Sequence, residues 1–189
     1  MFLLHRPSPD QVARFVGESQ ALPLSYDRTA LAPAVPAGFA VDEHVAVVRV
    51  GPDAFAKAVA ALTAWRHFAL GWVELLPERA PIAPGTVVSV AVRHLGFWSL
   101  NGCRVLYATG SANRTTFGFA YGTLTNHAEC GEELFEVSLD PATGAVSYRI
   151  YAVSRPRALL ARAGYPYTRL LQARFRRDSV RALRRAIES

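Results

Sequence analysis

The chain has only two cysteines, Cys103 and Cys130, and a single lysine, Lys57, among its 189 residues. Two cysteines are too few for a disulfide framework, which favours a reducing compartment. No apolar run approaches the roughly 20 residues that cross a bilayer. The start, MFLLHRPSPD, has an apolar patch too short for a secretory signal. We therefore expect a cytoplasmic protein without a transmembrane segment.

Motifs that would name a reaction are also missing. The sequence has no phosphate loop, no dinucleotide-binding fingerprint, no GxSxG elbow and no HExxH. His127 and Cys130 lie close together, beside Glu129, Glu132 and Glu133. Their spacing matches no established metal signature and a second pair of ligands is missing. We therefore expect no metal and no cofactor.

The net charge of +6 is concentrated at the C-terminal end of the chain. Residues 155–189 hold ten arginines and two acidic residues, a local charge of +8, so the rest of the chain carries −2. Such a segment either binds an anionic partner or forms the solvated face of a helix. Few aromatic residues are interleaved with the arginines, which counts against stacking on single strands. We favour the solvated face and expect no nucleic-acid binding.

The first half of the chain predicts a cap followed by a strand and a helix. Residues 8–18 form a short helix, with Ser8 as its cap and Pro9 at its first position, and the segment up to residue 40 is irregular covering. Residues 43–50 are a valine-rich strand. Gly51-Pro52-Asp53 then opens a helix whose apolar residues recur at helical spacing: Phe55, Val59, Leu62 and Trp65.

The second half predicts a meander and a long helix. Residues 86–95 alternate as a strand, Asn101-Gly102 predicts a hairpin turn, and residues 110–113 predict another. Residues 132–139 and 145–154 are strands joined by the turn DPATG. Residues 156–187 follow as a helix, with a possible break at residues 164–166.

This order predicts an α+β fold in which an antiparallel sheet grips a long C-terminal helix. The layout is similar to the helix-grip architecture of START and Bet v 1-like proteins, where sheet and helix enclose a cavity. We expect one domain over residues 1–189, with residues 1–40 as the N-terminal covering and 41–189 as the helix-grip core. Because fold does not imply function, the site must be argued from side chains.

Strand alternation places three polar side chains on the apolar face of the sheet. His94 shares a face with Val88 and its neighbours, Glu133 with Phe135, and Ser154 with Tyr148. A buried carboxylate needs a partner, and His94, Arg104 or Arg155 would supply it. The cluster is either a small-molecule pocket or an internal salt-bridge network, and the sequence leaves both open.

Several segments together resemble the DUF1990 family of proteins of unknown function. They are WRHFALGWVEL, HLGFWSLNGCRVLY, FGFAYGTLTNHAECGEELFEV, YAVSRP and YPYTRLLQARFRRDS, and they extend over roughly residues 47–183. The resemblance implies a single domain but no activity. It draws attention to further polar residues within the matching segments, which complete our candidate ligand-binding set: His94, Arg104, Tyr121, Thr123, His127, Glu133, Ser154, Arg155 and Gln172.

Three functions follow from these observations. The leading hypothesis is a module that binds a hydrophobic or amphipathic small molecule in a cavity between sheet and C-terminal helix. The second is an enzyme acting on such a ligand, with Glu133 or His127 as general acid–base. The third is an interaction protein whose arginine-rich C-terminal helix binds nucleic acid or anionic lipid. Neither the oligomeric state nor the ligand follows from the sequence.

Overall fold

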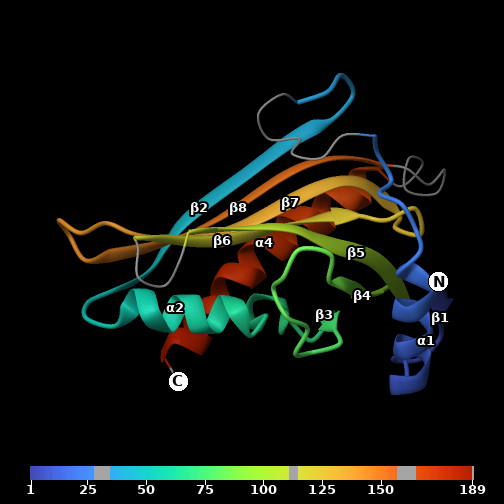
Figure 1. The fold of residues 1–189 in the computed structure, drawn as a ribbon, viewed down its shortest axis with the longest axis horizontal. Helices are drawn as coiled ribbons and strands as arrows, with labels where there is room; N and C mark the ends of the chain where they lie inside the picture. Colours follow the sequence, from blue (N-terminus) through green and yellow to red (C-terminus); the bar gives the residue numbers. More distant parts are fainter. Residues whose placement is uncertain (28–34, 111–114, 157–164, 189) are drawn as a thin grey trace.

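The backbone forms one curled antiparallel sheet with a long C-terminal helix across its concave face (Figure 1). The computed structural model describes residues 1–27, 35–110, 115–156 and 165–188. Within these residues eight strands pair in the order β2-β8-β7-β6-β5-β4-β3, and β1 pairs with β5. The strands are β1 Phe2–Leu3, β2 Ala40–Val50, β3 Val73–Leu76, β4 Val87–His94, β5 Phe97–Gly110, β6 Thr116–Thr123, β7 Glu129–Leu139 and β8 Ala145–Pro156.

The long helix α4 (Tyr165–Glu188) crosses the concave face, and α2 (Ala54–Thr63) packs beside its C-terminal half (Figure 1). The predicted α+β helix-grip class is therefore confirmed. The N-terminal part of the predicted helix, residues 157–164, lies outside the described residues.

The N-terminal helix α1 (Pro9–Ser19) forms as expected from its cap. Ser8 Oγ accepts from the backbone N–H of Gln11, and the Gln11 side chain accepts from the Ser8 N–H, so two free helix donors are satisfied. Val12 and Phe15 pack with Trp98 and Leu100 in a small core of their own.

The predicted hairpin at Asn101-Gly102 is wrong, because both residues lie inside the continuous strand β5. The turn instead falls at Leu95-Gly96, where both residues have positive φ, the requirement of a tight two-residue hairpin. Asn101 Nδ2 donates to the Val90 carbonyl across the β4–β5 pair. A Cβ at Gly102 would overlap the Asn126 side chain, so this glycine serves a close approach and not a turn.

The main core lies between the concave face and the helices. The second half of α4 contributes fully buried side chains such as Leu183 and Ile187, whereas residues in its first half, such as Leu171 and Phe175, are only partly buried. Aromatic rings fill the centre: Trp65, Phe68, Phe119, Phe135 and Tyr148. The C-terminal half of α4 is thus anchored by fully buried apolar side chains, whereas its N-terminal half is not.

The opposite, convex face of β5 and β6 is covered by the segment after α1. Leu24 forms a bridge with Leu124, and Tyr26 lies over Gly122, where any Cβ would overlap its hydroxyl. Arg104 anchors this segment, because its Nη2 donates to the carbonyls of Gln20 and Leu22.

Candidate functional site

A row of side chains crosses four adjacent strands on the concave face. Asp42 pairs with Ala152, Ala152 with Glu133, and Glu133 with Tyr121. Directly paired residues project from the same face of a sheet, so these four side chains lie side by side below α4. The small Ala152 stands between the two carboxylates and keeps them apart.

Glu133 and Tyr121 form a hydrogen-bonded pair within this row. Tyr121 Oη donates to Glu133 Oε2 at 2.7 Å, and the Tyr121 ring lies 5.5 Å from the ring of Phe135 on the same face. Among the described residues, no arginine, lysine or histidine lies within salt-bridge distance of Glu133. The carboxyl group is therefore held by one neutral donor at the edge of an aromatic core.

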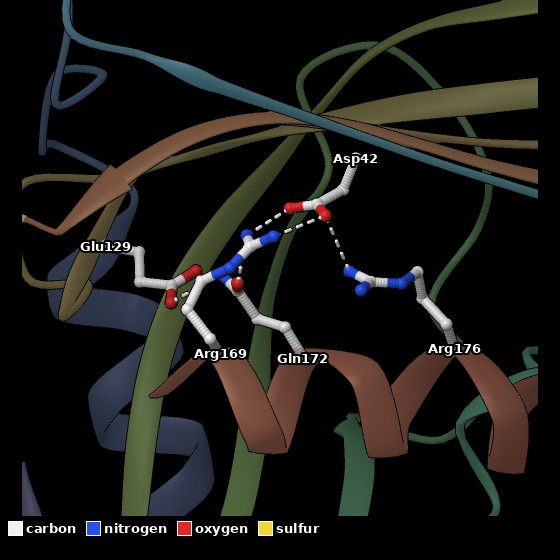
Figure 2. A network of polar contacts seen from close by, with 5 residues as sticks. All are labelled: Asp42, Glu129, Arg169, Gln172 and Arg176. Carbon is white, nitrogen blue, oxygen red and sulfur yellow. Dashed lines mark hydrogen bonds and ion pairs between the residues drawn. The ribbon is translucent and has the colours of Figure 1, made fainter. Parts of the chain in front are cut away.

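The first half of α4 presents a polar stripe to this row (Figure 2). Arg169 forms a two-pronged ion pair with Asp42, with Nη2 donating to Oδ1 at 2.7 Å, and Arg176 Nη1 lies 3.3 Å from the same carboxylate. Gln172 accepts from Arg169 and donates to Glu129 Oε1, both at 2.8 Å. Spacings of three and four residues put all three helix residues on one face.

Burial and charge shift the ionisation of the three carboxyl groups in different directions. Desolvation raises the pKa of Glu133 to about 7, and it outweighs the hydrogen bond from Tyr121, which lowers it. Desolvation also raises the pKa of Glu129. Asp42 behaves in the opposite way, because its hydrogen bonds with Arg169 lower its pKa. At neutral pH the site therefore combines a permanently charged carboxylate with one that exchanges a proton.

Two neighbouring groups of this site can take part in acid–base chemistry. Glu133 both donates and accepts a proton near neutral pH, and Tyr121 supplies a hydroxyl beside it. The nearby Cys103 thiol is fully buried, and desolvation raises its pKa, so it is not an activated nucleophile. In the described part of the chain no group of three or more histidines, cysteines and acidic residues has metal-site geometry.

Two predicted partners of Glu133 are wrong. Arg104 alternates with Cys103 and Val105 of the concave face, so it projects to the convex face, where it binds backbone carbonyls. Arg155 is exposed and its guanidinium lies 4.7 Å from the centre of the Phe39 ring. Strand alternation alone separates both arginines from Glu133.

The other candidates occupy three different places. Ser154 pairs with Gly131 and Ala40, one step beyond the row of Glu133 on the same face. The Thr123 hydroxyl is taken by contacts with Ser25 and the backbone of Gly131. His94 is only partly buried and lies 6.4 Å from the Tyr167 ring, at the end of β4 beside the hairpin to β5.

His127 belongs to the turn between β6 and β7. Its Nδ1 accepts from the backbone N–H of Glu129 at 2.9 Å, and burial lowers its pKa to about 4. It therefore stabilises a turn as a neutral imidazole, separate from the Glu133 row. Gln172, by contrast, is part of the polar stripe on α4.

Sequence reasoning missed Asp42, Glu129, Arg169 and Arg176. Asp42 lies one residue before the predicted start of its strand, which in fact begins at Ala40. The predicted solvated face does not include Arg169 and Arg176, but it holds for other arginines of the helix: Arg174 and Arg181 pair with Asp178, and Arg177 and Arg185 are exposed. The signal that would have found the stripe is the helical spacing of Arg169, Gln172 and Arg176.

The expected cavity differs from what the structure contains. Aromatic side chains fill the centre of the space between sheet and α4. A groove of about 570 Å³ lies elsewhere, between α2, the turn after it and the end of α4, where alanines such as Ala60 and Ala182 line it together with Lys57, Arg66 and Arg185. No helix in the described residues is long and apolar enough to cross a membrane.

The curled antiparallel sheet and the long helix across its concave face define a helix-grip fold. Comparison with solved structures agrees. A protein from Thermus thermophilus superposes with a TM-score of 0.54 at 8% identity, over 78% of this chain and 97% of that chain. An aromatase/cyclase from a Streptomyces species gives 0.50 at 15% identity, over 79% and 94%.

The family is shown by sequence. The model of the domain of unknown function DUF1990 matches residues 25–182, so the chain belongs to this family, as the resemblance implied. A UPF0548 protein of Deinococcus radiodurans is 36% identical over 98% of both chains. A UPF0548 protein of Dictyostelium discoideum is 37% identical over 80% of this chain and 74% of its own.

Proposed function

We propose that the concave face binds an amphipathic small molecule, with its polar head at the Tyr121–Glu133 pair and its apolar body under α4. One observation carries the proposal: a partly buried carboxyl group with a single neutral hydrogen-bond partner stands at the border of an aromatic core. An apolar pocket with a few convergent polar groups is the usual form of a small-molecule site. Neither His94 nor Arg104 is part of the proposed head site.

The first half of α4 suits the entry of such a molecule. Its contacts with the sheet include ion pairs and hydrogen bonds through Arg169, Gln172 and Arg176, and these exchange for contacts with water more readily than buried leucine does. Its apolar residues Leu171 and Phe175 are only partly buried, whereas the second half is held by fully buried apolar side chains such as Leu183. Opening at the first half therefore disturbs the core less than opening at the second half.

Native mass spectrometry of the protein, purified without denaturation, tests the proposal. We expect a bound adduct in the wild type that is lost in Glu133→Gln and retained in Glu136→Gln. Glu136 is the matched control, because it lies on the same strand but on the opposite face, beside Arg149. An adduct retained in both variants, or absent from wild-type protein, would contradict the proposed site.

A second candidate, acid–base catalysis on the bound molecule, is favoured by the pKa of about 7 at Glu133. A general acid–base group works best when its pKa is close to the operating pH. The test is incubation of the identified ligand with the protein in D₂O. Deuterium entering a carbon position with wild-type protein, but not with Glu133→Gln, would establish catalysis, whereas an unchanged ligand mass in both would leave binding alone.

A further inference from the structure

His67 is a fully buried histidine whose imidazole lacks hydrogen-bond partners. It has no exposed surface, and in the described part of the chain neither Nδ1 nor Nε2 has a partner. An unsatisfied buried polar group costs about 1 to 3 kcal/mol, and native proteins contain few of them. A phenylalanine of similar shape would avoid that cost entirely.

The shell around His67 is aromatic. The ring centres of Phe68 and Phe135 lie 4.7 and 4.8 Å away, and Trp65 is stacked on the imidazole at 5.8 Å with an interplanar angle of 19°. Phe119 and Tyr148 complete the shell at 5.9 and 6.1 Å. Desolvation lowers the pKa of His67 to about 3, so the ring is neutral under ordinary conditions.

The chain also adopts a strained backbone conformation at this position. Trp65, immediately before the 3₁₀ turn η1 (Arg66–Phe68), has a φ of 56°, a left-handed conformation that is costly for a bulky side chain. The Trp65 indole is fixed by donating to the Ala80 carbonyl at 2.8 Å. Strain and an orphaned polar group therefore coincide at one turn, a combination typical of functional sites.

We propose that His67 is the deep polar contact for a bound ligand, and that this ligand is a flat aromatic molecule carrying a neutral hydroxyl group. The inference rests on the proposed function and extends it. A neutral imidazole offers one donor and one acceptor, and a hydroxyl group satisfies either. Aromatic walls favour a flat ring through stacked and edge-to-face contacts, and they offer nothing to stabilise a charge.

Phe175 of α4 packs against Phe68 and Phe135, two rings that each contact both His67 and Tyr121. Its ring centre lies 5.2 Å from that of Phe68 and 6.4 Å from that of Phe135, both of which also contact His67. Phe175 is only partly buried and lies in the polar-contact half of the helix. A ligand ring that takes the place of the Phe175 ring would lie between the two polar positions.

Two naphthalenes of equal size test the inference: 2-naphthol, and 2-methylnaphthalene, in which a methyl group replaces the hydroxyl. Binding is measured by calorimetry and by quenching of tryptophan fluorescence, in wild type and in Phe175→Ala, which removes the Phe175 ring. One net hydrogen bond is worth about 1 to 1.5 kcal/mol, so we expect 2-naphthol to bind about tenfold tighter.

His67→Phe should remove this preference, keep binding of 2-methylnaphthalene and raise the melting temperature. His67→Leu serves the same purpose if the larger ring prevents folding, and His94→Phe, at the edge of the sheet, should leave the preference unchanged. An equal preference in the His67 variants and the wild type would overturn the inference. Failure of both naphthalenes to bind, while the Glu133-dependent adduct is present, overturns this inference alone; failure without any adduct overturns the proposed function as well.

Discussion

Replacing Glu133 with glutamine should stabilise the protein at neutral and alkaline pH, because the carboxyl group is destabilised when it ionises inside the fold. Its pKa rises from 4.5 to about 7 on folding. The folded state therefore holds the proton more tightly than the unfolded state. The stabilising contribution is complete below pH 4.5 and is lost as the pH rises to about 7.

The size of the effect follows from the shift. At 1.36 kcal/mol for each pKa unit the shift corresponds to about 3 kcal/mol, and partial exposure of Glu133 lowers this to about 2 kcal/mol. Glutamine carries no charge at any pH, and its Oε1 still accepts from Tyr121. The difference in unfolding free energy between Glu133→Gln and wild type should therefore grow by about 2 kcal/mol between about pH 4.5 and about pH 8.

The assay is urea denaturation at half-unit steps from about pH 4.5 to about pH 8.5. Other groups titrate in this range, since His67 and His127 have lowered pKa values and change stability in the opposite direction. Subtracting the wild-type curve removes these contributions. Glu136→Gln is the control, because it deletes a carboxylate from the opposite face of the same strand. Parallel curves for Glu133→Gln and wild type would refute the reasoning.

Four further predictions follow from the same structure. Asp42→Asn removes the carboxylate that Arg169 and Arg176 contact and should cost about 1 to 2 kcal/mol, with faster hydrogen exchange in residues 166–176 before residues 179–187. Gly122→Val forces Tyr26 away and should cost about 1 to 3 kcal/mol by thermal denaturation, whereas Gly17→Ala, with open space at its Cβ, should cost nothing. Leu183→Ala should cost about 2 to 5 kcal/mol by urea denaturation, and Leu170→Ala, at a 68% exposed position, less than about 0.5. His67 stays neutral in the fold, so the free energy of unfolding falls as the pH drops from 6.5 towards 3 and the unfolded state takes up the proton first. His67→Phe should therefore unfold at lower pH than wild type in an acid titration.

Local patterns predicted the fold because they agreed with its tertiary structure. The cap at Ser8 and the alternation on β4, β7 and β8 depend only on residues close together in the sequence. Asn101-Gly102 misled because its two residues are used across strands: the asparagine binds Val90 and the glycine makes room for Asn126. The same Asn-Gly sequence is used for a turn in one setting and for close contact between segments in another. Only the residues that pack against it distinguish the two.

The site was predictable only as far as single strands allow. Alternation on β7 placed Glu133 correctly with Phe135, and the structure gives it a hydrogen bond from Tyr121. The pairing register that joins Asp42 to this row, and the rotation of α4 that aims Arg169 at it, depend on packing between segments far apart in the sequence. The orphaned state of His67 is likewise a property of the assembled core, since a histidine between Trp65 and Phe68 has no distinguishing pattern.

The most direct test of the central claim is a titration of isotopically labelled protein with 2-naphthol, followed by methyl and aromatic NMR shifts. The account predicts changes at Ile150 and Phe135 on the concave face and at Leu171 of α4, and none at the exposed valines of the convex face, Val41, Val45 and Val47. Changes gathered instead at Ala60, Ala64 and Ala182 would place the ligand in the outer groove between α2 and α4 and contradict the proposed site.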